Sequence, residues 1–143
     1  MKKTVCRILL ITMLIFVFVS CHSEKTVIEG YEWKMRSVMH AENDCLIVDA
    51  ASEENAAHPE AKIVDMMLVA RDGEITLTDL TNQKKYKGSY AVSGKNPKGT
   101  DYRVIIDGKE GFATVAMTTY SNGTEEPTLP INLGKYSIYF YAY

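Results

Sequence analysis

The sequence predicts an all-β domain in which about eight to nine antiparallel strands form an up-and-down meander that closes into a barrel. Apolar and polar residues alternate along most of the chain, and turn-forming Asn, Asp and Gly residues separate the alternating segments. The closing segment, residues 136–143, is apolar on both faces and would aggregate as an exposed edge. We therefore expect it to pair on both sides, which a barrel provides. A two-sheet sandwich is the alternative.

The expected strands follow one another with short connections. In the first strand, Trp33 and Met35 alternate with polar neighbours. Asp72-Gly73, a dipeptide typical of tight hairpins, joins the third strand to the fourth, and Asp107-Gly108 marks a later turn. The expected strands span residues 31–37, 46–49, 63–70, 74–78, 86–92, 102–106, 112–120, 128–132 and 135–142.

Helix is expected at one place in the domain, the longest connection, between the second and third strands. Ser52 is a suitable N-cap there, and Glu53 and Glu54 would lie in the first helical turn. Pro59 would end the helix quickly, so we expect only a short helix within residues 52–61.

Residues 1–20 have the pattern of an export signal helix rather than of the domain. Lys2 and Lys3 precede an apolar run over residues 8–19. That run is shorter than the roughly 20 apolar residues of a membrane-spanning helix, which argues against an uncleaved anchor. An ordinary secretory peptide, cut after Ser23, is the other alternative.

The end of this segment, Phe18-Val19-Ser20-Cys21, resembles the lipobox of bacterial lipoproteins. The resemblance implies cleavage after Ser20 and acylation of Cys21 with chains such as palmitate. Each methylene buried in the bilayer contributes about 0.8 kcal/mol of membrane affinity, so the lipid would hold the protein at the outer face of a bacterial membrane, in the cell envelope. The chain then divides into a signal peptide (1–20), a lipidated cysteine and tether (21–29) and a barrel domain (30–143).

Charge and cysteine content exclude several classes of function. Residues 1–20 contain three of the 16 basic residues and none of the 18 acidic ones, so their removal leaves 13 against 18, a net charge of −5. The chain has no basic stripe for nucleic acid or for an anionic membrane surface. Cys45 would be the one thiol left, and its apolar neighbours indicate a buried side chain. We expect a disulfide-free monomer that binds no nucleic acid.

Three segments of the domain together resemble the lipocalin-like barrels of small bacterial lipoproteins. They are Gly30-Tyr31-Glu32-Trp33, the run from Asp72-Gly73-x-Ile75-x-Leu77 into Tyr86-x-Gly88-x-Tyr90, and the tyrosine-rich closing strand. The resemblance covers about residues 30–143 and implies a calycin-type barrel. It implies no particular ligand.

Alternation along the strands places a set of apolar side chains inside this barrel. An eight-stranded barrel either fills its interior with such side chains or holds one small ligand. The leading hypothesis is a binding protein for a small apolar or amphipathic ligand, and the alternative is a filled barrel whose outer Tyr139, Tyr141 and Tyr143 dock a protein or a glycan. The expected ligand contacts are Trp33, Met35, Met67, Tyr90, Met117 and Phe140, and the inward set also includes Val69, Ile75, Leu77, Val104 and Ile138.

Catalytic and metal-binding signatures are weak. The sequence has no Gly-x-Ser-x-Gly motif, no phosphate-binding glycine loop and no cysteine pair at metal spacing. His40, Glu42 and Asp44 alternate near the end of the first strand and are a conceivable metal trio, but polar residues in such a loop are more often simply solvated. His58 has no partner visible in the sequence. We expect neither an enzyme nor a cofactor, and a metal-dependent enzyme is the least favoured class.

Overall fold

The computed structural model describes residues 26–42, 46–49 and 62–143. The predicted signal segment, Cys21, Cys45 and the predicted short helix lie outside these residues. In the described part of the chain, no helix is long and apolar enough to cross a membrane. The elements, in chain order, are the 3-10 turn η2 (Ile28–Gly30) and the strands β1 (Glu32–His40), β2 (Leu46–Asp49), β3 (Lys62–Ile63), β4 (Met66–Arg71), β5 (Glu74–Asp79), β6 (Lys84–Asn96), β7 (Gly99–Ile106), β8 (Lys109–Thr119), β9 (Glu125–Leu133) and β10 (Tyr136–Ala142).

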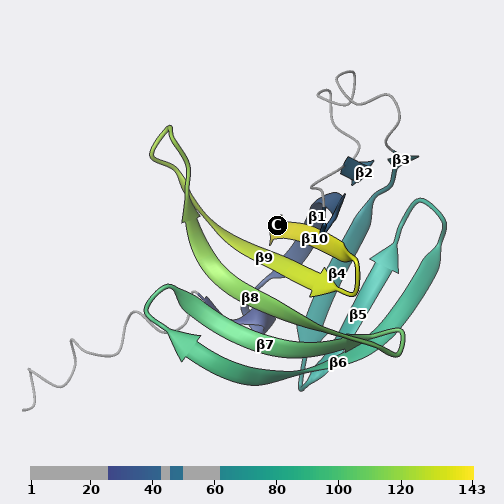
Figure 1. Cartoon of the computed structure of the whole chain (residues 1–143), viewed down its shortest axis with the longest axis horizontal. Helices are drawn as coiled ribbons and strands as arrows, with labels where there is room; N and C mark the ends of the chain where they lie inside the picture. Colours follow the sequence, from purple (N-terminus) through teal and green to yellow (C-terminus); the bar gives the residue numbers. More distant parts are fainter. Residues whose placement is uncertain (1–25, 43–45, 50–61) are drawn as a thin grey trace, which may run out of the picture.

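Eight of these strands form a closed antiparallel barrel (Figure 1). From β4 to β10 each strand pairs with the next one in sequence, as in an up-and-down meander. β1 lies between β4 and β10 and closes the barrel by pairing with both. The predicted fold class is thus confirmed, as is the expectation that the last strand is paired on both sides, because β10 lies between β9 and β1.

Tight turns with positive φ connect several of the strands, as the sequence predicts. Asp72 and Gly73 have φ angles of 50° and 81°, and Asp107 and Gly108 have φ angles of 51° and 74°. Two such residues in succession give the hairpin turn that matches the twist of antiparallel strands. η2 lies at the same end of the barrel as the β4–β5, β6–β7 and β8–β9 turns, which we call the η2 end. The β5–β6, β7–β8 and β9–β10 turns form the far end.

β1 divides its pairing between two partners on one side. Its first residues, Glu32–Lys34, pair with β4, and its later residues, from Ser37 to Met39, pair with β2. β2 in turn pairs with β3 in parallel, so these two short strands extend the sheet outside the barrel (Figure 1). A register shift between Met35 and Ser37, opposite β10, leaves Arg36 without a cross-strand partner there. Such a bulge changes the direction of a side chain, and Arg36 contributes to the surface described below.

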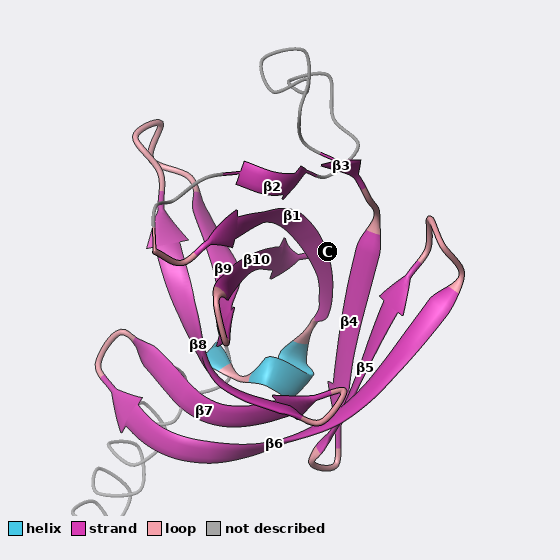
Figure 2. Ribbon diagram, turned by 45° about the vertical axis from the view of Figure 1, so that its right-hand side comes forward, coloured by secondary structure: helices cyan, strands magenta, loops and turns pink. Residues whose placement is uncertain are grey.

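One continuous apolar core occupies the barrel. Trp33, at 0% exposed, lies in it, as the sequence predicts. Its indole Nε1 donates a hydrogen bond to the carbonyl oxygen of Ile28 over 2.8 Å, and the backbone N–H of Ile28 donates to the Tyr102 hydroxyl over 3.1 Å. Ile28 is itself buried, so η2 connects β1 to β7 across this end of the core (Figure 2).

The inner face of β4 differs from the sequence prediction. Leu68 and Ala70 are buried in the core, whereas Met67 and Val69, predicted to point inward, are only half-buried. Met67 pairs with Lys34, which lies on the outer wall, so Met67 lies there too. The prediction was wrong because nearly every residue of this strand is apolar, and alternation then carries no information about which face is inside.

Candidate functional site

The interior of the barrel is filled with side chains over most of its length. A side chain that lines a void large enough for water keeps accessible surface there. Within the described residues, seven apolar side chains that reach the interior from five strands are 0% exposed, so they border no such void. They are Trp33, Met35, Leu68, Val104, Val115, Leu129 and Ile131.

The six residues predicted to contact a ligand therefore do not form one site. Trp33, Met35 and Phe140 belong to the packed core. Met67 lies on the outer wall, as described above. Met117 is half-buried near the end of β8, opposite Pro127, beyond the last fully buried residue of that strand. Tyr90 is half-buried and packs against the core from the η2 end.

Tyr90 has a polar partner at the η2 end. Its hydroxyl donates a hydrogen bond to the Glu29 carboxylate, and its ring packs edge-on against Tyr102 with centroids 5.8 Å apart. Burial, together with the hydrogen bond to Glu29, raises the pKa of Tyr90 to about 12. Tyr90 is protonated at neutral pH, and its hydrogen bond to Glu29 joins η2 to β6.

A small hollow opens beside η2, between the start of β1 and the end of β4. Its volume is about 190 Å³. The charged side chains at its border, Glu29, Glu32 and Arg71, are all exposed to solvent. This hollow is a recess open to solvent. The hollow is lined by Glu29, Gly30, Tyr31, Glu32, Val69, Ala70 and Arg71.

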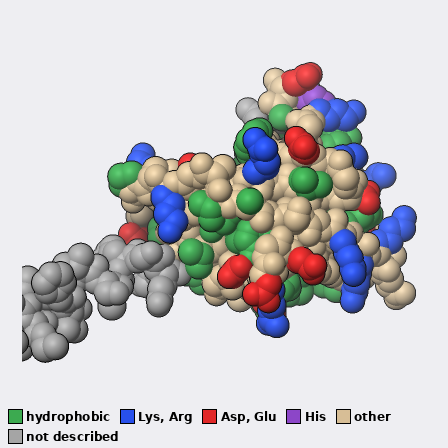
Figure 3. All heavy atoms as spheres, turned by 90° about the horizontal axis from the view of Figure 1, so that it is seen from below, with side chains coloured by type: hydrophobic (Ala, Val, Ile, Leu, Met, Phe, Trp, Pro, Cys, Tyr) green, Lys and Arg blue, Asp and Glu red, His purple; other side chains and the backbone are tan. Residues whose placement is uncertain are grey.

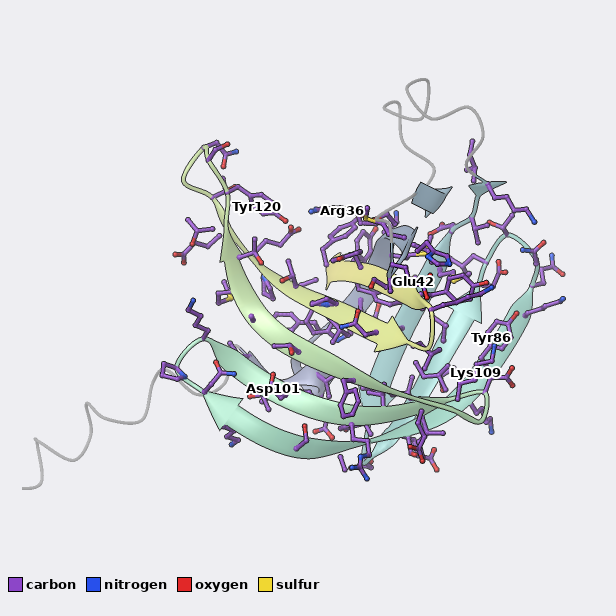
Figure 4. The ribbon with its side chains drawn as sticks, in the orientation of Figure 1. Arg36, Glu42, Tyr86, Asp101, Lys109 and Tyr120 are labelled. Atoms are coloured by element: carbon purple, nitrogen blue, oxygen red, sulfur yellow. The ribbon has the colours of Figure 1, made fainter. Side chains whose placement is uncertain are left out.

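Apolar surface becomes accessible towards the far end. Met66, Tyr86, Leu133 and Tyr136 are half-buried there and pack against the core. Lys135 places its ammonium 5.4 Å from the centre of the Tyr136 ring. In the face of the molecule seen in Figure 3, Lys and Arg side chains gather at the right-hand end, where the β5–β6 and β7–β8 turns lie. The far end thus combines half-buried apolar side chains with a basic border, and Figure 4 labels Tyr86 and Lys109 there.

Asp79, at the same end, has a structural role. Its carboxylate is buried and accepts hydrogen bonds from the backbone N–H of Asn82 over 2.8 Å and from the Asn82 side chain over 2.7 Å. Burial alone would raise the pKa of the Asp79 carboxyl, but these hydrogen bonds outweigh it and lower the pKa overall. Asp79 therefore stays charged and caps the β5–β6 turn.

The outer wall carries an ordered group of four side chains, Arg36, Tyr120, Glu126 and Tyr141, which we call the Tyr–Arg cluster. The Arg36 guanidinium donates to the Tyr120 hydroxyl over 2.7 Å and to the Glu126 carboxylate over 3.1 Å. The Tyr120 hydroxyl in turn donates to Glu126 over 2.7 Å. The guanidinium carbon lies 4.9 Å from the centre of the Tyr141 ring. Figure 4 shows Arg36 and Tyr120 directed toward each other from β1 and the end of β8.

The fold explains how residues so far apart in sequence meet. β1 lies next to β10 and β10 next to β9, so Arg36 reaches Glu126 by passing over Tyr141. Burial alone would lower the pKa of Arg36, but its contacts with Tyr120 and Glu126 raise it, so the guanidinium stays charged. No local sequence pattern points to Arg36, Tyr120 or Glu126, because the partners of the two hydrogen bonds are 84 and 90 residues apart in the chain.

The three tyrosines of the closing strand that were predicted to point outward do so. Tyr139 is 38% exposed and Tyr143 is 76% exposed. Lys34, on the neighbouring strand, places its ammonium 5.3 Å from the centre of the Tyr143 ring. Alternate residues of a strand share a face, so Tyr139, Tyr141 and Tyr143 form a row along β10 beside Lys34 and Arg36.

Of the conceivable metal trio, the structure describes His40 and Glu42. In that part of the chain, no group of three or more His, Cys, Asp or Glu side chains is placed to hold a metal ion. His40 accepts a hydrogen bond at Nδ1 from the backbone N–H of Glu42 over 3.4 Å, and its ring packs edge-on against Tyr136. Asp44 lies outside the described residues.

Comparisons with protein families, with curated proteins and with solved structures find no match to this chain.

Proposed function

We propose that this protein is an exported lipoprotein, acylated at Cys21 and held at the outer face of a bacterial membrane, and that its filled barrel is a scaffold for docking a partner on the outer wall. The observation that carries the proposal is the contrast between the two faces of the same strands. The inner face has no accessible surface to offer a ligand over most of the barrel. The outer face carries the Tyr–Arg cluster and the row of tyrosines.

The cluster has the composition of a binding surface. Tyrosine and arginine are enriched among the residues that contribute most to binding energy. Hydrogen bonds and an aromatic contact hold Arg36 in one place, so a partner would not have to order this long side chain on binding. A surface ion pair contributes only about 0–1 kcal/mol to folding, so stability alone is a weak reason for this arrangement.

The tether would keep this surface close to the membrane. Six residues lie between Cys21 and Ile28, and the seven residue steps that join them span at most about 25 Å when fully extended. A partner would therefore have to reach the protein within a short distance of the bilayer.

The test places a photo-crosslinking amino acid at position 143 of the full chain in its own host, and at position 112 as a control. Phe112 is aromatic and 63% exposed but lies on β8 towards the far end, away from the cluster. We expect a cross-linked product at position 143 that Arg36→Ala reduces severalfold, and none at position 112. Equal products at both positions, or none at either, would refute docking on this face.

Export and acylation are tested separately. Cys21→Ala should move the protein from the membrane fraction to the soluble or secreted one. A wild-type protein whose mature N-terminus is free at Glu24 would show that an ordinary secretory peptide was removed instead.

A second candidate function, binding of a small amphipathic ligand, is favoured by the far end. Met66, Tyr86, Leu133 and Tyr136 keep accessible apolar surface there, and exposed lysines border it. The test is titration of the full chain with a fluorescent fatty-acid probe. One-to-one binding that Tyr86→Ala weakens and Tyr143→Ala leaves unchanged would support this site, and no saturable binding would exclude it.

A further inference from the structure

The chemistry of the outer wall indicates what kind of partner it takes, an inference that rests on the proposed docking function. We propose that the Tyr–Arg cluster and the exposed rings beside it bind an uncharged glycan, with sugar rings stacked on the tyrosines and sugar hydroxyls bonded to Arg36 and Glu126.

The charges at the centre of this surface favour an uncharged partner. Arg36 and Glu126 form the ion pair at the centre of the surface, so their charges compensate each other. An anionic partner would compete with Glu126 for the guanidinium, and a cationic one would compete with Arg36 for the carboxylate. Either partner would weaken an existing pair or meet a like charge beside it, whereas an uncharged partner does neither.

The cluster also has unused hydrogen-bonding capacity. Arg36 uses two of its five N–H donors, one toward Tyr120 and one toward Glu126. Glu126 accepts the hydrogen bonds from Arg36 and from Tyr120 at the same oxygen, Oε2. Its other oxygen, Oε1, is left as an acceptor for a partner. The surface therefore presents free donors and a free acceptor side by side. Neighbouring hydroxyls on a sugar ring both donate and accept, so they match this arrangement.

The shape of the outer wall suits a glycan as well. Tyr139 and Tyr143 are exposed at either end of the row, and successive same-face residues on a strand are about 6.5–7 Å apart. Flat rings at this spacing on an open wall suit the apolar faces of linked sugar rings. The side chains that share the outer face of β9, Glu126, Thr128, Pro130 and Asn132, are mostly polar. An anchor residue of a protein partner would instead require an apolar pocket at this place.

The experiment titrates the purified full chain with neutral hexasaccharides of glucose, of mannose and of N-acetylglucosamine, and with a hexamer of galacturonic acid as the charged counterpart. Calorimetry reports affinity, and tyrosine ring signals in NMR spectra report the site. We expect at least one neutral hexasaccharide to bind, with affinity insensitive to salt and with shifts at Tyr139, Tyr141 and Tyr143.

The variants separate stacking from folding. Tyr143 is largely exposed, so Tyr143→Ala should leave the fold intact while weakening glycan binding about fivefold, and Tyr143→Phe should restore most of it. Glu126→Ala should remove binding. Phe112→Ala, a control on the same wall, should change nothing.

Each contrary result has a definite meaning. If no neutral hexasaccharide binds but cross-linking at position 143 yields a product of discrete mass, the partner is a protein: the glycan inference is wrong and the docking function stands. If the galacturonic acid hexamer binds more tightly and salt weakens it, the partner is anionic and the inference is also wrong. If nothing binds and nothing cross-links, both proposals fail.

Discussion

The inner and outer faces of β1 and β10 have opposite chemistry. Inside, Trp33, Met35 and Phe140 pack into a core that excludes water. Outside, Arg36 and Tyr141 belong to a hydrogen-bonded, charged and partly exposed network on the same two strands. The strand period of two lets one pair of strands serve both purposes. Substitutions on the inner face should therefore change stability, and substitutions on the outer face should change binding.

The largest effect on stability is expected inside. Trp33→Ala removes a fully buried indole and its hydrogen bond to Ile28, and it should lower the free energy of unfolding by about 3–5 kcal/mol. Tyr143→Ala, at the exposed end of the same strand pair, should change it by less than about 0.5 kcal/mol. Urea unfolding of both variants measures the difference. A similar loss of free energy of unfolding in Trp33→Ala and Tyr143→Ala would mean that the inner and outer faces do not differ in their contribution to stability.

Backbone packing inside the wall gives a second test. A Cβ added at Gly88 would clash with the carbonyl oxygen of Ile105 on β7, whereas one added at Gly94, on the same strand, would make only ordinary contact with Asp101. Gly88→Ala should therefore lower the free energy of unfolding by about 1–3 kcal/mol, and Gly94→Ala should be nearly neutral. Thermal unfolding compares the two variants. A Gly88→Ala variant as stable as the wild type would show that β6 and β7 lie farther apart than in the structure.

A pH-dependent effect is expected at the far end. The folded pKa of Asp79 is lowered from its ordinary value of 3.8, so its contribution is complete above that value and is lost as the pH falls through the folded pKa. Asp79→Asn should cost about 1 kcal/mol at neutral pH. Below about pH 4 the variant should lose less stability than the wild type does. Urea unfolding at several pH values measures this. If the free energy of unfolding falls equally in both proteins as the pH decreases, the lowered pKa of Asp79 is contradicted.

Only a small effect on stability is expected in the Tyr–Arg cluster. Arg36→Ala breaks an exposed ion pair and should lower the free energy of unfolding by no more than about 1 kcal/mol. The same substitution should nevertheless reduce cross-linking at position 143. A loss of stability as large as that of Trp33→Ala would identify the cluster as structural and remove the reason to regard it as a binding surface.

How much the sequence predicts also differs between the two faces. Trp33, Ile75 and Leu77 alternate with polar residues, so their inward direction could be read directly, as could the Asp72-Gly73 turn. The sequence does not reveal whether the Met67 side chain points inward or outward, since both faces of its strand are apolar.

The outer surface was predictable only in part. Alternation identifies Tyr139, Tyr141 and Tyr143 as sharing one face. The position of Arg36 depends on a bulge, and its contact with Glu126 depends on strand neighbours that are distant in sequence. Neither leaves a local pattern, so a single sequence cannot reveal them.

The central claim is that the barrel is filled and that its function lies outside. Titration of the wild-type full chain with a fluorescent fatty-acid probe, followed by the emission of Trp33, tests this most directly. We expect no saturable change in the wild type, whereas Met35→Ala, which empties part of the core, should create weak probe binding. One-to-one binding to the wild type that quenches Trp33, and that Met35→Ala weakens, would contradict a filled barrel.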